Sequence, residues 1–520
     1  MTDDTYDLFV IGGGINGCGI ARDAVGRGYS VALAEMNDFA SATSSQSTKL
    51  FHGGLRYLEF FEFRLVREAL IERENLLSAM PHISWPMRFV LPMHDSMRFD
   101  NTTPTSKLLG TVMPWMKGRR PNWLIRLGLF MYDNLGGREI LPGTAKLDLK
   151  RNPVGAPLDD KFEVAYEYSD CWIEDARLVL LNARDAAARG ATIMPRTKVL
   201  SANYDGDLWT IETERDGEKS THQARMIVNA GGPWVEDIIR QTIRINTQEG
   251  VRLVRGSHIV TKKLFDHDKC YFFQGTDGRI IFAIPYEQDF TLIGTTDQEH
   301  SDASIKPVCS EEEADYLRAF ASKYFRKPIE KDDIVWTYSG VRPLYDDGAK
   351  SATAATREYV LTVDKSTGGP VLNVFGGKIT TYRKLAEAAL EKINEAMNRE
   401  TKEWTKRVAL PGGDFPVKSV DKQRSELQAS FAFFSPKTTH RLFRQYGTEA
   451  KTIFEGVTSL EECGADLGHG VTGREVDWAI ANEWVHTADD FLWRRSKLGL
   501  HFSTEEAARL ESYIAGKLTA

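Results

Sequence analysis

Three glycines near the N-terminus have the spacing of a phosphate-binding turn. Gly12, Gly14 and Gly17 form the pattern G-x-G-x-x-G. The first glycine permits a tight turn, the second lets the backbone approach a pyrophosphate, and the third allows a helix to pack closely on a strand. Glu35, an acceptor for ribose hydroxyls, follows Gly17 by eighteen residues. An acid at this place favours a free 2′-hydroxyl, so the pattern predicts FAD or NAD rather than NADP.

The flanking sequence supplies the elements that such a turn requires. Residues 8–11 are a short apolar run, expected to form a strand buried on both faces. Residues 18–25 indicate a helix with small side chains, and residues 30–34 a second strand. Ile15 and Asn16 lie beside the helix N-terminus, where free N–H groups and the helix dipole attract phosphates. We therefore expect a βαβ dinucleotide site rather than an isolated structural turn.

A polar segment after this unit carries a second group of reactive side chains. Residues 41–49 are rich in serine and threonine, and their composition alone also fits an ordinary polar loop. They lead into His52, Gly53, Gly54 and Arg56. A nicotinamide enzyme is expected to continue with further βαβ units instead. This segment therefore favours FAD over NAD.

The stretch from 41 to 59 resembles the FAD-dependent glycerol-3-phosphate dehydrogenases of the respiratory, aerobic type, within the D-amino-acid-oxidase-like flavoenzymes. The resemblance extends along nearly the whole chain. Its motifs lie at residues 167–172, 175–179, 228–234, 255–258, 293–297, 338–344 and 375–383. It implies oxidation of sn-glycerol 3-phosphate to dihydroxyacetone phosphate by hydride transfer to FAD, with electrons passed to a membrane quinone.

The resemblance also implies a set of FAD contacts beyond the glycine turn. Val199 is expected beside the adenine, and the loop at 376–381 beside the pyrimidine edge of the isoalloxazine ring. N–H groups of that loop would stabilise negative charge near N1 and O2 of the flavin. The other expected contacts are Thr43, Ser44, Ser45, Thr48, Lys49, Leu50, His52, Gly53, Gly54, Ala230, Gly231, Gly376, Gly377, Lys378, Thr380 and Thr381.

A glycerol phosphate needs cations for its phosphate group. Arginine suits phosphate because its planar fork donates two parallel hydrogen bonds. By resemblance, Arg342, Arg357 and Lys378 line the phosphate side of the pocket. Arg56 and Tyr57 are expected beside the glycerol portion.

The reaction also needs a base for the proton of the C2 hydroxyl, and two histidines compete for this role. His258 and His52 both lie in glycine-containing motifs. A neutral imidazole can accept such a proton near neutral pH, although either ring could equally be structural. His52 is nearer in sequence to the flavin-facing loop and could contact the ring instead, so we favour His258. Arg342 and Lys378 complete the expected catalytic group.

Residues 108–132 have the composition of a membrane interface. Apolar, tryptophan-bearing stretches flank a basic cluster at 117–120, although core packing of 124–132 is the alternative. The part from about 99 to 119 is longer than in the family members that the chain otherwise resembles, and its role is left open. Since no apolar stretch approaches 18 residues and no signal peptide is visible, we expect peripheral attachment to the cytoplasmic face of a bacterial inner membrane.

The expected fold is α/β, because 520 residues exceed one compact core and the motifs imply several units. It consists of a discontinuous Rossmann-like FAD-binding domain with a parallel sheet, an antiparallel-sheet substrate domain, and an all-α C-terminal domain. The oxidoreductase core is expected at 1–390 and the helical domain at 405–520. Within the core, FAD-binding segments are expected at about 1–95, 165–245 and 340–390, and substrate segments at about 96–164 and 246–339.

Composition excludes some classes and leaves others open. A net charge of −7 gives no basic field for nucleic acid, and the five scattered cysteines show no metal-binding or redox spacing. Three rivals remain: an oxidase that returns electrons to oxygen, a flavoenzyme that oxidises an amine or amino acid, and a non-catalytic dinucleotide sensor. A homodimer is compatible with the sequence but not specified by it.

Overall fold

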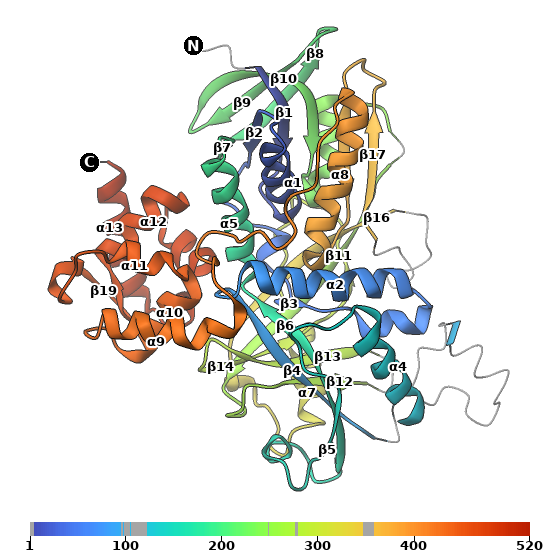
Figure 1. The fold of residues 1–520 in the computed structure, drawn as a ribbon, viewed down its shortest axis with the longest axis vertical. Helices are drawn as coiled ribbons and strands as arrows, with labels where there is room; N and C mark the ends of the chain where they lie inside the picture. The colour runs from blue at the N-terminus through green and yellow to red at the C-terminus, as the bar shows by residue number, and fades with distance from the viewer. Residues whose placement is uncertain are drawn as a thin grey trace.

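The computed structural model describes residues 5–94, 97, 104–105, 122–247, 249–275, 279–346 and 358–519. Its elements form a largely parallel sheet covered by helices, an antiparallel sheet, and a helical C-terminal part (Figure 1). The predicted fold class is therefore confirmed.

The first sheet brings the predicted cofactor loops to one edge. Among the described residues it has eight strands, in the order β17-β18-β10-β1-β2-β7 with β9 beside β10 and β8 beside β9. β10 pairs in parallel with β1 and β18, and β1 pairs in parallel with β2, so the loops after these strands meet at a single edge. The strands are β1 (Thr5–Ile11), β2 (Val31–Ala34), β7 (Thr192–Met194), β8 (Lys198–Tyr204), β9 (Trp209–Arg215), β10 (Glu218–Asn229), β17 (Val360–Asp364) and β18 (Val371–Phe375).

Three helices pack together against this sheet. α1 (Ile15–Gly26) contacts both α5 (Asp175–Ala188) and α8 (Tyr382–Met397). A Cβ atom on Gly19 of α1 would lie 2.8 Å from Cδ2 of Tyr382, so glycine is needed for the close approach of α8.

The second sheet is mostly antiparallel and contributes the other wall of the predicted site. Among the described residues it has ten strands, in the order β15-β11-β14-β13-β12-β4-β6-β3 with β16 beside β11 and β5 beside β6. Three of these strands, β3, β4 and β6, lie in stretches that were expected to belong to the FAD-binding segments. The pattern of apolar residues predicts a strand but does not indicate which sheet the strand joins. The strands are β3 (Leu50–Phe51), β4 (Ser84–Pro92), β5 (Ala145–Asp148), β6 (Val164–Ile173), β11 (Val251–Lys262), β12 (Cys270–Gln274), β13 (Ile280–Tyr286), β14 (Phe290–Gly294), β15 (Gln298–Glu299) and β16 (Ile334–Tyr345).

Helices cover the second sheet and join it to the first. α7 (Glu311–Ser322) packs on β11, β13 and β14, and α4 (Asn122–Leu135) packs on α2 (Phe63–Ala79). α2 is tied to α8 by Glu72, whose carboxylate accepts two hydrogen bonds of 2.7 Å from Arg383. A short element, α6 (Val235–Asp237), follows β10.

The C-terminal part docks beside α5 (Figure 1). Arg177 and Arg184 of α5 make ion pairs with Glu483 at 2.6 Å and Glu449 at 2.7 Å. Across the described part of the chain, no helix has the length and apolar character needed to cross a membrane. The elements of this part are α9 (Val420–Ser430), α10 (Pro436–Tyr446), α11 (Glu449–Ile453), α12 (Gly473–Glu483), α13 (Thr504–Leu518), β19 (Asp466–Gly468) and β20 (Val471–Thr472).

Candidate active site

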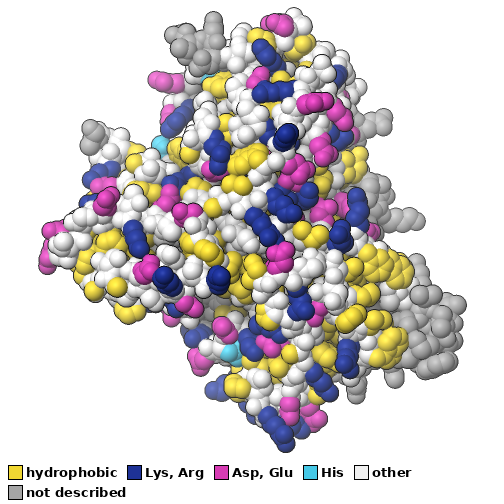
Figure 2. Space-filling model, in the orientation of Figure 1, with side chains coloured by type: hydrophobic (Ala, Val, Ile, Leu, Met, Phe, Trp, Pro, Cys, Tyr) yellow, Lys and Arg dark blue, Asp and Glu magenta, His cyan; other side chains and the backbone are white. Residues whose placement is uncertain are grey.

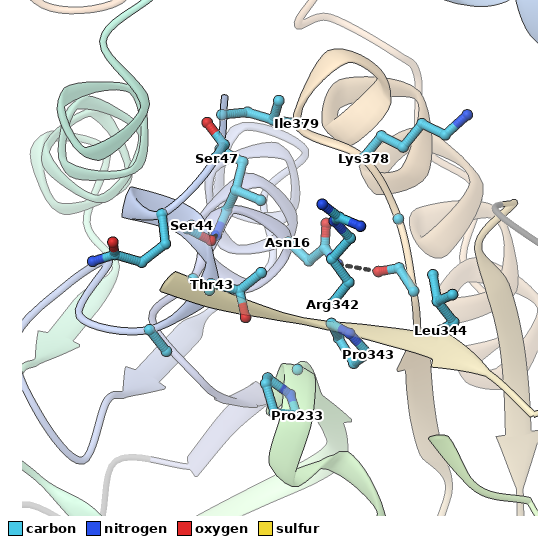
Figure 3. A pocket seen from close by; sticks show the side chains of 18 of the residues that line it. Asn16, Thr43, Ser44, Ser47, Pro233, Arg342, Pro343, Leu344, Lys378 and Ile379 are labelled. Atoms are coloured by element: carbon cyan, nitrogen blue, oxygen red, sulfur yellow. Dashed lines mark hydrogen bonds between the residues drawn. The ribbon is translucent and has the colours of Figure 1, made fainter. Parts of the chain in front are cut away.

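A cavity of about 1100 Å³ opens where the loops of the first sheet face the second sheet. Pockets for small ligands usually measure roughly 300–1,000 Å³, so this one has room for a dinucleotide together with a small substrate. In Figure 3, Thr43 and Ser44 lie on one side of Asn16 and Lys378 on the other. Segments far apart in the chain therefore line one space.

Most of the predicted site residues lie in the wall of this cavity. Those in the wall are Gly12, Gly14, Ile15, Asn16, Glu35, Thr43, Ser44, Thr48, Leu50, His52, Gly54, Arg56, Tyr57, Val199, Ala230, Gly231, His258, Arg342, Gly376, Gly377, Lys378 and Thr380. Those outside the wall are Gly17, Ser45, Lys49, Gly53 and Thr381. Arg357 and most of the 99–119 segment lie outside the described residues.

The glycine turn has the geometry that its spacing predicts. Gly12 has a φ of +112°, and a Cβ on Gly17 would lie 1.9 Å from the carbonyl oxygen of Gly12. Gly17 thus serves the turn by packing and not by facing the cavity. The Ser44 hydroxyl accepts a hydrogen bond of 3.0 Å from the N–H of Ile15, the first residue of α1. The serine-rich segment therefore supports the helix N-terminus.

Glu35 directly follows β2, beside the glycine turn. Its carboxylate accepts hydrogen bonds from the N–H groups of Gly13 at 2.6 Å and Asn37 at 2.8 Å. Burial raises the pKa of Glu35, and these two N–H groups oppose the rise. The side chain is thus fixed at the cavity edge in a position suited to a ribose.

Two predicted cofactor contacts stand behind the wall instead of in it. The Lys49 ammonium lies 2.8 Å from a carboxylate oxygen of Asp175 and donates to the Ser45 carbonyl at 3.0 Å. Both members of the ion pair are buried. Lys49 and Ser45 therefore fasten the polar segment to α5, because a buried ammonium needs an anionic partner more than it needs the cavity.

The loop after β18 meets the glycine turn. Gly376 and Gly377 have φ values of +69° and +97°, and the Asn16 amide donates a hydrogen bond of 3.0 Å to the Gly376 carbonyl. The loop continues through a 3-10 turn (Ile379–Thr381) into α8, so an N-terminal helix end faces this part of the wall. The Asn16 side-chain oxygen is buried without a partner among the described residues.

Three of the predicted cations line the cavity in the described structure. Arg342, on β16, makes an ion pair with Asp297 and donates to the Thr295 hydroxyl at 3.4 Å. The Lys378 ammonium lies 4.1 Å from the ring centre of Tyr57, and Arg56 lines the same wall. Asp297 belongs to the motif at 293–297, and its spacing in the sequence does not predict that it holds Arg342.

His258 occupies a defined pocket on β11. Its Nε2 lies 2.9 Å from the Thr48 hydroxyl, and its ring stacks on Tyr338 at 4.6 Å. A Cβ on the opposite residue, Gly294, would lie 2.0 Å from the imidazole Cδ2, so glycine makes room for the ring. Burial, with help from Arg342 and Lys49, holds the pKa of His258 well below its usual range.

The two ring nitrogens of His258 differ in their surroundings. Nε2 faces Thr48, whereas Nδ1 is buried without a hydrogen-bond partner in the described structure. The ring is 2% exposed and neutral at pH 7. His52 also lines the cavity and is half-buried.

A buried polar network supports the His52 loop, and sequence reasoning missed it. The Asp170 carboxylate accepts hydrogen bonds from the Tyr132 hydroxyl at 2.7 Å and from Arg73 at 2.6 Å. The Tyr132 hydroxyl in turn accepts a hydrogen bond of 2.7 Å from the N–H of Gly53. Asp170 also lines the cavity. Asp170 belongs to the motif at 167–172, but the spacing of that motif does not predict that its carboxylate supports the loop at Gly53.

The wall fits FAD in size and in chemistry. Gly12 and Gly14 line the cavity beside the N-terminus of α1, where a pyrophosphate is expected, and Glu35 sits where a ribose diol is expected. The unpartnered oxygen of Asn16 shows a polar acceptor placed for a ligand that donates.

Comparison with known proteins agrees with this assignment. Residues 7–383 match the family model described as FAD dependent oxidoreductase, and residues 403–515 match the C-terminal domain of alpha-glycerophosphate oxidase. The chain is 46% identical to the D-erythritol 1-phosphate dehydrogenase of Brucella abortus over 520 residues, covering 99% of both chains. It is 44% identical to the glycerol-3-phosphate dehydrogenase of Pseudomonas aeruginosa over 513 residues, covering 98% of this chain and 95% of the other.

A solved structure shows the same architecture. The FAD complex of the glycerol-3-phosphate dehydrogenase from Bacillus halodurans superposes with a TM-score of 0.71 at 26% identity, covering 100% of this chain and 95% of that one. The cofactor is therefore FAD. The chain belongs to the FAD-dependent glycerol-3-phosphate dehydrogenase family, within the FAD dependent oxidoreductases.

Proposed function

We propose that this protein oxidises the C2 hydroxyl of sn-glycerol 3-phosphate to the ketone of dihydroxyacetone phosphate and passes the two electrons to a membrane quinone. FAD, when bound, supplies the acceptor for the hydride that leaves C2. The hydroxyl proton goes to a base of the protein. The observation that carries the proposal is the meeting of Arg342, Lys378 and neutral His258 in one cavity that fits FAD.

The cations support a phosphate-bearing substrate. Asp297 and Thr295 hold the Arg342 guanidinium at the wall, while the ring of Tyr57 holds Lys378. Two such cations, with Arg56 beside them, match a phosphate dianion better than the single carboxylate of an amino acid. The arrangement therefore favours glycerol 3-phosphate over the amine substrates of the wider superfamily.

His258 has the properties of the base. Its lowered pKa keeps the ring neutral, so a lone pair is available at pH 7. In the tautomer in which Nε2 donates to Thr48, Nδ1 is the acceptor, and it has no hydrogen-bond partner in the described structure. His52 remains the alternative, because it lines the same cavity.

A quinone acceptor is supported by a surface beside the cavity. The 3-10 helix η2 (Leu55–Phe60) lines the cavity, and the residues just after it, Phe61 and Phe63, are exposed and stacked at 6.1 Å. Both η2 and α2, which carries Phe63, contact α4, whose exposed side includes Trp123 and Phe130. Figure 2 shows hydrophobic side chains gathered over the region where Figure 1 places α4. An apolar electron acceptor in a bilayer could approach the cavity from this side.

A second candidate substrate is D-erythritol 1-phosphate, a polyol phosphate one carbon longer. It is favoured by the 46% identity, over 99% of both chains, to a protein named for that activity. The same cations and base would serve both substrates, since they share a phosphate and a secondary alcohol.

The test is anaerobic addition of each substrate to purified holoenzyme while flavin absorbance is followed. We expect bleaching with glycerol 3-phosphate, and the ratio of kcat/KM values for the two substrates identifies the preferred one. Arg342→Gln should raise KM by roughly 10- to 100-fold, the effect of losing a charged hydrogen bond. Arg252→Gln, on the same sheet but outside the cavity wall, is the matched control and should leave KM unchanged.

Failure to bleach with either phosphate would refute the proposal, and bleaching by an amino acid would favour the amine-oxidising alternative. The acceptor is tested separately. Near-stoichiometric hydrogen peroxide per turnover would identify an oxidase, whereas the proposal expects fast reduction of a quinone and little peroxide.

A further inference from the structure

The loop after β2 is held from behind by the C-terminal helices. Residues 35–39, here called the ribose loop, connect β2 to the polar segment. The first three of them line the cavity. Asp38 and Phe39 lie outside the wall and are only 3% and 1% exposed. The contacts that hold the side chains of Asp38 and Phe39 therefore also hold the ribose loop in position.

Asp38 is bound by two arginines of the C-terminal part. Arg495 donates to its two carboxylate oxygens at 2.5 and 2.8 Å, and both side chains are almost fully buried. Arg494 donates to the same carboxylate. Arg495 is itself anchored, because its guanidinium donates to the carbonyls of Glu483 at 3.0 Å and Trp484 at 3.3 Å. The end of α12 and the ribose loop thus share one guanidinium.

A second connection reaches the loop through its backbone. The N–H groups of Arg196 and Thr197 donate to the carbonyls of Asn37 at 2.9 Å and Glu35 at 2.7 Å. The Arg196 side chain then pairs with Asp490 of the C-terminal part at 2.6 Å. The C-terminal part therefore also reaches the loop at Asn37, through Arg196.

An aromatic contact completes the arrangement. The ring of Trp484 meets that of Phe39 edge-on at 5.3 Å. Phe39 lies directly against the glycine turn, because a Cβ on Gly13 would stand 2.7 Å from its Cδ1. Movement of Phe39 would therefore disturb the phosphate-binding turn as well as the ribose loop.

We propose that the C-terminal part forms the outer support of the FAD site, with Arg495 and Arg494 positioning the ribose loop through Asp38. Removing one partner of a buried ion pair leaves a charge without solvation, and the loop must move to hydrate it. Glu35, three residues earlier, would then lose its alignment with the ribose. FAD affinity, more than substrate affinity, should depend on this contact.

The experiment measures flavin release from full-length holoenzyme on dilution, followed by the rise in flavin fluorescence. Asp38→Asn and Arg495→Met should raise the dissociation constant for FAD by roughly 10-fold or more, the size expected when the support of a binding group is lost. With FAD in excess, the KM for glycerol 3-phosphate should stay at the wild-type value. The visible spectrum of the flavin still bound should also be unchanged, because neither Asp38 nor Arg495 lines the cavity.

The control variant is Lys437→Met, which cuts another interdomain ion pair, to Asp289, that does not touch the ribose loop. It should leave FAD affinity unchanged. An unchanged dissociation constant in Asp38→Asn, or an equal loss in Lys437→Met, would overturn the proposal. Should Arg495→Met fail to fold, the nearly isosteric Asp38→Asn decides. Flavin retention does not require a substrate, so this result is separable from failure of the proposed function.

Discussion

Thr48 is the residue on which the orientation of His258 depends. Its hydroxyl forms a hydrogen bond of 2.9 Å with Nε2, and the ring stacks on Tyr338, so both neighbours hold the imidazole in one orientation. Gly294 makes room for the imidazole on the neighbouring strand. If His258 is the base, its efficiency rests on these three neighbours as much as on its own chemistry.

Replacing Thr48 by valine should therefore slow flavin reduction by substrate. We expect a fall of roughly 10-fold, smaller than the roughly 10²- to 10⁴-fold loss for removal of a general base in His258→Ala. Stopped-flow absorbance measures both rates. Thr48→Ser, which keeps the hydroxyl, is the control and should recover most of the wild-type rate. Wild-type reduction in Thr48→Val, with an unaltered flavin spectrum, would show that the hydroxyl does not orient the base.

At the scale of single elements, α4 presents two different faces. Leu129 and Tyr132 are buried against the antiparallel sheet, whereas Trp123, Leu127 and Phe130 are 52%, 44% and 64% exposed. These three exposed residues are separated by four positions and then by three, which places them on one side of the helix. The alternative that this stretch packs in the core therefore holds for one face only.

Substituting the exposed face should separate membrane binding from chemistry. The triple variant Trp123→Ser, Leu127→Ser, Phe130→Ser is expected to lose most sedimentation with anionic vesicles and most quinone reduction, because apolar area drives interfacial insertion. Anaerobic bleaching by substrate should persist. Ile305→Ser with Val308→Ser removes a similarly exposed apolar pair elsewhere and should bind vesicles normally. Full vesicle binding by the triple variant would reject α4 as the contact.

For the molecule as a whole, buried histidines link stability to pH. His82 is fully buried between the core and the C-terminal part, and neither ring nitrogen has a partner in the described structure. Burial, and then the charges of Arg177, Arg444 and Arg184, keep the pKa of His82 well below its usual range. An unfolded chain protonates this ring near pH 6.5, whereas the folded chain does not. The stability that the fold gains by keeping the His82 ring neutral is therefore fully present above about pH 6.5 and is lost as pH falls below this value.

His82→Gln should remove this dependence. Between pH 7 and pH 5 the wild type should lose up to about 2 kcal/mol more of its free energy of unfolding than the variant loses. Urea unfolding of both holoenzymes measures this difference. The comparison between variants is needed because buried carboxyls titrate in the opposite sense; burial raises the pKa of Glu287 to about 8. The partly exposed His300→Gln is the control and should keep the wild-type slope. Parallel slopes for His82→Gln and wild type would refute the assignment.

Much of the cofactor half was predictable because its signals are local. Gly12, Gly17 and Glu35 act within a single βαβ unit, and steric limits on a tight turn are visible in the spacing of glycines alone. The strands of the second sheet were assigned less well, since β4 and β6 look like any apolar strand until their partners are known. Arg357 and its surroundings stay a prediction, as they lie outside the described residues.

Residue types and their spacing along the chain are enough to predict the phosphate-binding turn, the acid after the second strand, and the reactive residues that indicate FAD. Which of these residues contact one another depends on the fold. Lys49 lies outside the cavity wall and pairs with Asp175, 126 residues away in the sequence. Thr48 contacts His258 across 210 residues, and Asp38 pairs with Arg495 across 457. The physical reason is that a buried charge or imidazole is assigned by the partners folding brings to it, and no spacing along the chain records them.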